Sequence, residues 1–243
     1  MNNIFSIDFR TATYDVGANG QVSLTSLQRY FQEAAHEHAN KLGVGFQDLR
    51  EQNIFWVLSA MYIEFDDLPG FDEVLTVKTW PRGINKFYSL RDVLFFHNYK
   101  TVAKATSLWL MVDISSKRIV RPEKIVQGID FFSEIRVFDD DFVPIVQMKE
   151  KELIEERLVR YSDLDINRHV NNVRYIEWIL DAVNDLHCNK KIVNLKIQYL
   201  SEFVENEKAL IYKEISSNPN EYKIEINHEN GKTGIRSVVG FKI

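Results

Sequence analysis

The hydrophobic and polar positions of the first half of the chain predict one helix followed by a run of strands. After an extended run over residues 4–14, apolar residues recur at three- and four-residue steps, which predicts an amphipathic helix with Ser23 as its N-cap. Its apolar side consists of Leu24, Leu27, Phe31, Ala34 and His38. Runs rich in β-branched and aromatic residues then predict strands at 55–65, 73–80, 86–97 and 101–113. Turns are expected at residues 69–70, 81–83 and 98–100.

The second half repeats this order of elements. A strand near residues 152–161 and a polar segment lead into a predicted helix over residues 170–187. Its apolar side consists of Val173, Ile176, Ile179, Val183 and Leu186. Further strands are predicted at residues 192–202, 208–216, 221–228 and 233–243. The segment that begins at Val22 can be laid over the one that begins at Val170, with several apolar positions matching, which indicates a duplication.

One long helix followed by antiparallel strands, twice, predicts an α+β chain made of two tandem hotdog units, each with a sheet wrapped around its helix. We expect an N-terminal hotdog at residues 1–122, a connector at 123–149, and a C-terminal hotdog at 150–243 that carries the catalytic residues.

Composition narrows the class of protein. The single cysteine, Cys188, excludes an intramolecular disulfide framework and a cysteine-rich zinc site. The net charge of −5 disfavours general nucleic-acid binding. No apolar run approaches the ~18 residues of a membrane span, and the first residues have no signal-peptide layout. We therefore expect a cytoplasmic protein. No glycine-rich phosphate loop occurs either, and neither a metal nor a cofactor is expected.

The polar segment before the second helix holds the largest group of candidate catalytic side chains. Asp165, Asn167 and His169 occupy alternate positions there. In an extended segment, alternate side chains point to one side, whereas in a helix Asn167 would lie nearly opposite the other two. An acid, an amide and an imidazole on one side of a segment that precedes a helix form a plausible site for polarising a carbonyl group.

The stretch from Ser162 to Asp181 resembles, nearly residue for residue, the signature of the acyl-acyl-carrier-protein thioesterases of plants and bacteria. Residues 55–64, 79–81, 91–92 and 105–109 are similar to further segments of that family, in the same order. The resemblance implies a double hotdog that hydrolyses the thioester between a fatty acyl chain and acyl carrier protein, which ends chain elongation. It also implies catalytic roles for Asp165, Asn167 and His169.

The same resemblance assigns a glutamate and a cysteine on the following strand. The glutamate corresponds to Glu202, but Phe203 stands where the family has the cysteine. A cysteine nucleophile therefore cannot act from that position, and water activated by a carboxylate is the expected mechanism. Glu202 is the preferred base and Asp165 the alternative. The backbone amides at the helix start, from Val170 and Asn171 to Asn172, are expected to complete an oxyanion site.

The substrate is expected to contact two further sets of residues. Aromatic side chains expected along an acyl tunnel are Phe31, Trp56 and Phe87. An acidic carrier protein would bind a locally basic surface, and the candidates are Lys117, Arg118, Arg121, Lys124, Arg168 and Arg174. Hotdog proteins often associate, so a homodimer is a further expectation. A thioesterase for coenzyme A esters, another hotdog acyl-thioester enzyme and a non-catalytic acyl-binding protein are the alternative functions.

Overall fold

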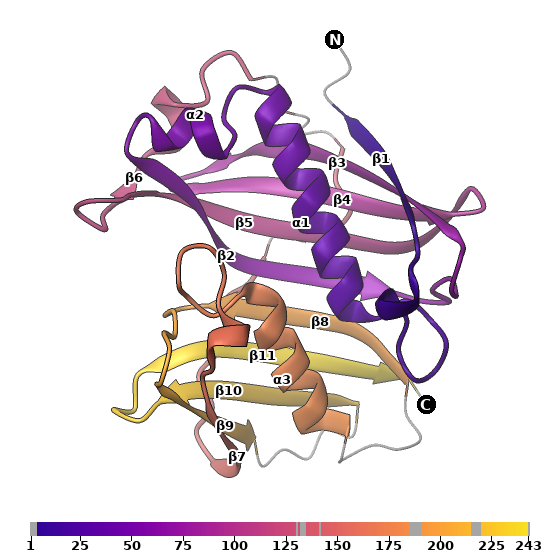
Figure 1. Ribbon diagram of the computed structural model, residues 1–243, viewed down its shortest axis with the longest axis vertical. Coiled ribbons are helices and arrows are strands. Elements are labelled where there is room, and N and C mark those ends of the chain that lie inside the picture. Colours follow the sequence, from indigo (N-terminus) through magenta and orange to yellow (C-terminus); the bar gives the residue numbers. More distant parts are fainter. Residues whose placement is uncertain are drawn as a thin grey trace. The chain divides into compact units, whose positions relative to one another are not determined.

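The computed structural model describes residues 4–129, 131, 135–140, 142–184, 191–214 and 220–242. The chain divides into two compact units, Met1–Phe142 and Val143–Ile243. In each unit one long helix lies across an antiparallel sheet (Figure 1). The division falls inside the segment that we expected to be a connector.

The first unit begins with β1 (Phe5–Arg10), a short 3-10 turn (Thr13–Asp15) and the long helix α1 (Leu24–Lys41). A short helix α2 (Phe46–Arg50) leads into its strands. These are β2 (Ile54–Phe65), β3 (Val74–Asn85), β4 (Tyr88–His97), β5 (Lys100–Asp113) and the two-residue β6 (Ile119–Val120). The strand order is β1-β3-β4-β5-β2, and β6 pairs with β5.

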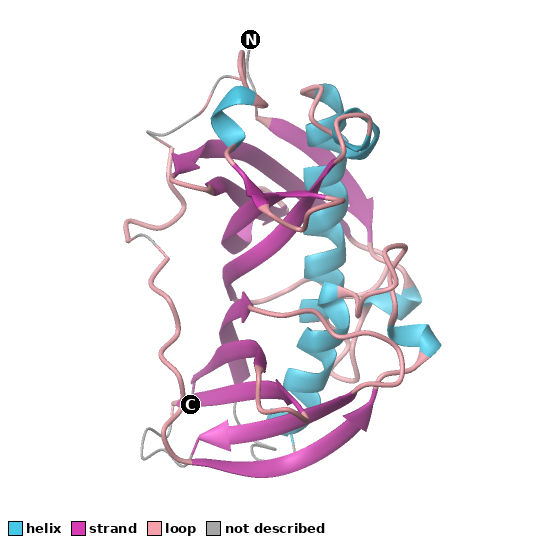
Figure 2. Ribbon diagram, turned by 90° about the vertical axis from the view of Figure 1, so that its left-hand side faces the viewer, coloured by secondary structure: helices cyan, strands magenta, loops and turns pink. Residues whose placement is uncertain are grey.

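The second unit has the same plan. It begins with β7 (Lys151–Leu158), a 3-10 turn (Tyr161–Asp163) and α3 (Asn172–Asn184). Its remaining strands are β8 (Lys191–Tyr199), β9 (Lys208–Glu214), β10 (Glu221–His228) and β11 (Thr233–Lys242). Their order is β7-β9-β10-β11-β8, which repeats the order of the first unit strand for strand. In both units the sheet curves beside the helix (Figure 2).

Burial of the helix stripes follows the predicted period. Leu27, Phe31 and Ala34 of α1 are at most 1% exposed, and the Ser23 hydroxyl caps the helix by accepting the Ser26 amide at 3.1 Å. In α3, Ile176 and Ile179 are fully buried. The predicted end of this helix, with Leu186 and Cys188, lies outside the described residues.

The predicted turn at residues 81–83 is wrong. Strand β3 continues to Asn85, with an irregular register between Pro81 and Gly83 against β4, and Lys86 adopts a φ of 57° in the hairpin turn that follows. Proline and glycine inside a strand pattern often mark its end. Both are tolerated at a β-bulge, however, because the extra residue there forms no hydrogen bond with the neighbouring strand. The expected turn at 98–100 is confirmed, since Asn98 and Tyr99 both have positive φ between β4 and β5.

Candidate active site

The acid–amide–imidazole segment forms a tight turn before α3. An antiparallel bridge pairs Leu164 with Val170. Inside this bridge the Asp165 amide donates to the His169 carbonyl at 2.8 Å, and the Arg168 amide donates to the Asp165 carbonyl at 3.0 Å. Arg168 has a φ of 63°, a left-handed conformation that closes the turn. The extended conformation that we considered for this segment is therefore wrong.

Asp165 supports this turn with its own carboxylate. Oδ1 accepts the amide of Asn167 at 2.8 Å and the amide of His169 at 3.3 Å. Aspartate commonly stabilises turns in this way, by bonding the backbone two residues further on. Asn167 is exposed, and no hydrogen bond joins its side chain to the other candidates within the described part of the chain. Backbone bonds, and not strand alternation, therefore set the positions of these side chains.

The imidazole of His169 faces the carboxylate of Glu202. His169 Nδ1 and Glu202 Oε2 lie 3.2 Å apart, with the two side chains 27% and 50% exposed. A β-bridge between His169 and Val204 keeps the turn beside the segment that follows β8. Of the four residues that the family resemblance selected, the structure thus joins these two directly. Asp165 acts on the backbone of the turn, and Asn167 stands apart.

Two amides expected at an oxyanion site are already engaged. The Val170 amide donates to the Phe203 carbonyl at 2.9 Å, and the Asn171 amide donates to the Asp163 carbonyl at 2.9 Å. Neither amide is free to bind a substrate oxygen. The prediction of an oxyanion role for Val170 and Asn171 is therefore wrong, because both belong to the bonds that fix the turn against its neighbours.

Asn171 instead caps α3. Its side-chain oxygen accepts the Val173 amide at 3.1 Å, as an N-cap residue does. The next amide, that of Asn172, begins the helix and donates to no acceptor among the described residues. A helix start carries partial positive charge, so the Asn172 amide is the donor at this position that could still meet an anionic oxygen.

Phe203, which stands where the resemblance places a cysteine, has a fully buried ring. The ring stacks on the imidazole of His228, with centroids 3.8 Å apart and planes 8° from parallel. His228 Nδ1 lies 3.5 Å from Glu207 Oε2, and burial lowers the pKa of His228. Since the chain's single cysteine is Cys188, which lies outside the described residues, the described site holds no thiol.

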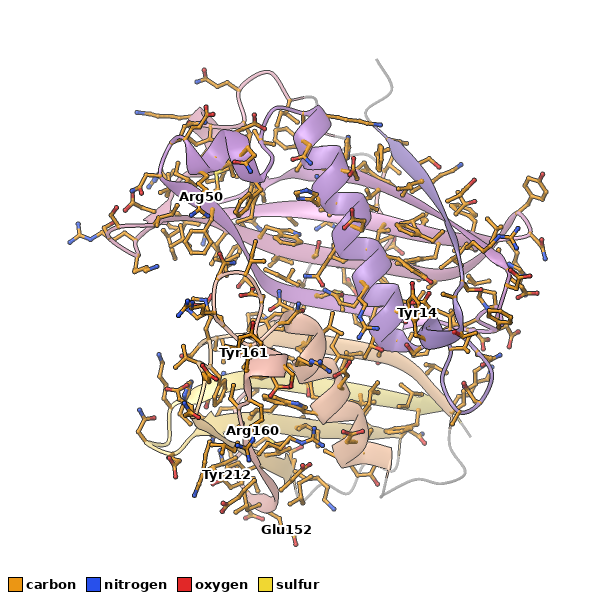
Figure 3. The ribbon with its side chains drawn as sticks, viewed as in Figure 1. Tyr14, Arg50, Glu152, Arg160, Tyr161 and Tyr212 are labelled. Carbon is orange, nitrogen blue, oxygen red and sulfur yellow. The ribbon has the colours of Figure 1, made fainter. Side chains whose placement is uncertain are left out.

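The basic candidates differ in how far they are engaged. Arg174 Nη2 donates to the Ser162 carbonyl at 3.1 Å, and its Nη1 lies 2.6 Å from Glu177, so this side chain braces the turn. Arg168 is exposed at the turn itself. Arg160 and Tyr161, labelled in Figure 3, lie on the approach to the same turn, and Tyr161 is 81% exposed. In the first unit the exposed basic candidates are Lys117, Arg118, Arg121 and Lys124.

The tunnel candidates all lie in the first unit. Phe31 is 1% exposed and packs 6.2 Å from the Trp109 ring. Trp56 is partly buried, and its indole N–H donates to the Val44 carbonyl at 2.9 Å. Phe87 is 39% exposed in the turn between β3 and β4, with Arg121 over its ring. Phe87 therefore lies at the surface and not in the interior of its unit.

The first unit contains the same turn, but without the acid and the imidazole. A bridge pairs Val16 with Val22, and the Gly17 amide donates to the Gln21 carbonyl at 2.8 Å. These bonds match those of the second unit one for one, so Gly17 stands in the place of Asp165 and Gln21 in the place of His169. Tyr14 and Tyr161, both labelled in Figure 3, belong to the short 3-10 turns that precede α1 and α3. An acid and an imidazole accordingly occur in the second copy of this turn alone.

Sequence reasoning missed two buried side chains behind Glu202. The Tyr175 hydroxyl accepts the Phe203 amide at 3.2 Å, and His228 packs on the Phe203 ring. No motif in the sequence marks His228. Tyr175 was hidden among the matches of the family signature, although a tyrosine beside an apolar helix stripe often has a buried hydroxyl that requires a partner.

The arrangement can perform acid–base chemistry next to a helix start. A carboxylate in contact with an imidazole can accept a proton from water, and the imidazole can hold or return that proton. Two units, each with one long helix on an antiparallel sheet, and an imidazole before the second long helix that faces a carboxylate after β8, define a double hotdog protein.

The chain belongs to the acyl-ACP thioesterase family. The N-terminal domain of that family matches residues 2–129, and its C-terminal domain matches residues 146–239. A crystal structure of an acyl-ACP thioesterase from Bacteroides thetaiotaomicron superposes with a TM-score of 0.89 at 25% identity, covering 99% of this chain and 98% of that chain. The 12:0-ACP thioesterase from Umbellularia californica gives a TM-score of 0.85 at 19% identity, covering 100% and 98%, and shares the fold.

Plant relatives match in sequence. The chloroplastic palmitoyl-acyl carrier protein thioesterase of Gossypium hirsutum is 31% identical over 74% of this chain and 47% of its own length. The protein of the same name from Arabidopsis thaliana is 28% identical over 82% of this chain and 52% of its own length. The chain thus spans about half the length of these relatives. No helix among the described residues is long and apolar enough to cross a membrane.

Proposed function

We propose that this protein hydrolyses the thioester of fatty acyl-acyl carrier protein, releases the free fatty acid and so ends chain elongation. The observation that carries the proposal is the 3.2 Å approach of His169 Nδ1 to Glu202 Oε2 beside the start of α3. This pair occurs in a member of the acyl-ACP thioesterase family whose matched regions include both residues. The relatives from cotton and Arabidopsis are named for the same reaction on a palmitoyl substrate.

Glu202 is the base in this mechanism. Its Oε2 faces His169, and its Oε1 has no interaction with the described residues, so Oε1 is free to take a proton from water. Asp165 is the weaker candidate, because its Oδ1 already accepts two backbone amides. The water oxygen attacks the thioester carbonyl carbon and the carbon–sulfur bond breaks. The proton held by the Glu202–His169 pair then passes to the departing thiolate, which restores both groups.

The oxyanion of the tetrahedral intermediate forms next to the turn. The Asn172 amide and the exposed side chain of Asn167 are the neutral donors proposed to face it. A thiolate is a good leaving group at neutral pH, since free thiols have a pKa near ~8.5, so the reaction requires little acid assistance. The demanding steps are water activation and oxyanion stabilisation, which are the steps assigned to these residues.

Acyl carrier protein is the proposed partner, with no nucleic acid involved. Arg168 is the basic candidate nearest the reacting pair, because it belongs to the turn that holds His169. Arg174 is assigned to bracing this turn. Location in the cytoplasm and homodimer formation stay predictions; the two plant relatives are named as chloroplastic proteins.

Thiol release from acyl-acyl carrier protein and acyl-coenzyme A of several chain lengths tests the proposal. The full chain should release thiol from the carrier-protein esters with the higher kcat/KM. The Glu202→Gln variant should lose ~10²–10⁴-fold in kcat, since this is the range that general acid–base groups contribute. Glu205→Gln, a matched change at an exposed acid three residues away, should remain near wild type.

Each other outcome has a distinct meaning. Binding of acyl chains without release from any ester would replace the enzyme by an acyl-binding protein. Preference for coenzyme A esters would overturn the carrier assignment alone. Near-normal turnover of Glu202→Gln, with a large loss in Asp165→Asn, would move the base to Asp165.

A further inference from the structure

Phe203, the residue that follows Glu202, is held at its amide by α3 and at its carbonyl by the turn before α3. On one side the Phe203 amide donates to the Tyr175 hydroxyl at 3.2 Å. On the other side the Phe203 carbonyl accepts the Val170 amide at 2.9 Å. Val170 directly follows His169 and Phe203 directly follows Glu202, so the backbone of Phe203 links the two members of the reacting pair.

The side chain of Tyr175 is buried among aromatic rings in the second unit. It is 2% exposed, and its ring contacts the rings of Trp178, Tyr199 and Phe203 with centroids 5.4 to 6.1 Å apart. Burial raises the pKa of its phenol, so the hydroxyl stays protonated and neutral through the working range of an enzyme. After burial, the negative charges of Glu202 and Asp165 raise the pKa of this phenol further.

Glu202 itself lacks comparable support. Its side chain is half exposed, and the one ion pair it forms with the described residues is that with His169. The direction of such a carboxylate depends on its backbone, and the next residue, Phe203, is bonded by Tyr175 and Val170. Loss of one of these bonds allows Glu202 to rotate away from His169.

We propose that Tyr175 is a positioning residue of the active site, which acts through the Phe203 peptide to hold Glu202 against His169. It does not contact the thioester. The inference rests on the proposed function for its kinetic consequence, but the bond between Tyr175 and Phe203 can be tested without catalysis.

The informative variant is Tyr175→Phe, which removes the hydroxyl and keeps the ring. Misplacing a catalytic group by about 1 Å costs roughly 10²-fold in rate, so we expect kcat to fall ~10- to 100-fold with KM little changed. The matched control is Tyr199→Phe. Tyr199 lies on β8, and its hydroxyl is buried without a hydrogen-bond partner among the described residues, so this variant should stay near wild type.

A double-mutant comparison separates positioning from general weakening of the fold. If Tyr175 acts through Glu202, Tyr175→Phe should cause little further loss of kcat in a Glu202→Gln background. The same fold loss in both backgrounds would overturn the proposal, as would wild-type kcat in the single variant, or an equal loss in Tyr199→Phe.

Amide hydrogen exchange at Phe203 gives the readout that does not depend on activity. The Phe203 amide should exchange faster in Tyr175→Phe than in wild type and should be unchanged in Tyr199→Phe. If the protein released no thiol from any ester while this exchange behaved as expected, the proposed function would fail and the structural bond would stand. Unchanged exchange in Tyr175→Phe would remove the basis for the positioning role.

Discussion

The ring of Phe203 occupies the space in which a side chain at position 234 would begin. A Cβ built on Gly234 would lie 2.2 Å from Cε2 of Phe203 and 3.0 Å from its Cζ. The ring cannot move aside easily, because it is fully buried and stacked on His228. The phenylalanine at position 203 therefore requires the glycine at position 234 on β11.

This coupling predicts a non-additive pair of substitutions. Gly234→Ala should lower the free energy of unfolding by about 1–3 kcal/mol, the usual cost of overpacking a core. Phe203→Cys should lower it by about 3 kcal/mol through the cavity that it leaves. In the Phe203→Cys background the added methyl group has room, so Gly234→Ala should cost almost nothing there. Urea denaturation of the four proteins measures this, and simple additivity would contradict the coupling.

The absence of a thiol from the described site predicts that catalysis does not depend on cysteine. Cys188→Ser removes the only thiol of the chain. With a carboxylate as the base, this variant should keep wild-type kcat and KM and should be unaffected by iodoacetamide. Thiol release from acyl-acyl carrier protein measures this directly, and a large loss of kcat in Cys188→Ser would require a nucleophile that the carboxylate mechanism does not include.

Periodicity predicted the parts of this structure that follow from burial. The stripe of α1 is buried as expected because a helix repeats every 3.6 residues and must cover its sheet. A turn was predicted at Pro81 and Gly83, where the strand in fact continues through a bulge. A bulge tolerates both residues, and the local sequence does not distinguish a bulge from a turn. The strand order also could not be derived from the runs themselves, since pairing depends on contacts between distant segments.

The sequence named candidate residues but did not predict how they are arranged. The family resemblance selected His169 and Glu202, which lie in contact. The segment is not extended, because the Asp165 carboxylate accepts the Asn167 amide and so stabilises a turn. The Val170 amide appeared free in the sequence, and its bond to Phe203 depends on a partner more than thirty residues away. Tertiary hydrogen bonds of this kind leave no local pattern.

The two roles of Asp165, charge and turn support, can be separated by two substitutions. Asp165→Asn keeps an oxygen that can accept the Asn167 and His169 amides, whereas Asp165→Ala removes it. We expect Asp165→Ala to lower the free energy of unfolding by about 1 kcal/mol, as loss of a similar capping bond does. Asp165→Asn should be close to wild type in stability. Equal stability of the two variants, measured by thermal unfolding, would contradict the turn role.

Buried His38 predicts acid sensitivity in the first unit. Burial, with help from the charges of Arg91 and Lys41, lowers the pKa of His38 from 6.5 to about 4. Arg91 Nη1 lies 3.0 Å from Nδ1, and the Phe5 ring stacks on the imidazole. The unfolded chain therefore binds a proton on His38 at higher pH than the folded chain does.

The resulting contribution to stability is complete above about pH 6.5 and is lost as the pH falls toward 4, to a total on the order of 3 kcal/mol. His38→Gln should flatten this part of the stability–pH curve, because glutamine does not titrate. His36→Gln, at an exposed position of the same helix, is the matched control and should leave the slope unchanged. Urea denaturation between pH 4 and pH 7 measures both slopes. An identical slope in wild type and His38→Gln would show that other groups carry the acid sensitivity.

Charge reversal distinguishes the two basic surfaces proposed to bind the carrier protein. Arg168 belongs to the catalytic turn, whereas Arg121 belongs to the basic stretch of the first unit and lies over the Phe87 ring. If the carrier binds beside the turn, Arg168→Glu should raise KM for acyl-acyl carrier protein several-fold and reduce its dependence on salt. KM for the coenzyme A ester, which lacks the protein surface, should change much less. Arg121→Glu should then stay near wild type on both substrates. The reverse result, with the loss confined to Arg121→Glu, would assign binding to the first unit, and equal losses on both esters in Arg168→Glu would indicate damage to the turn.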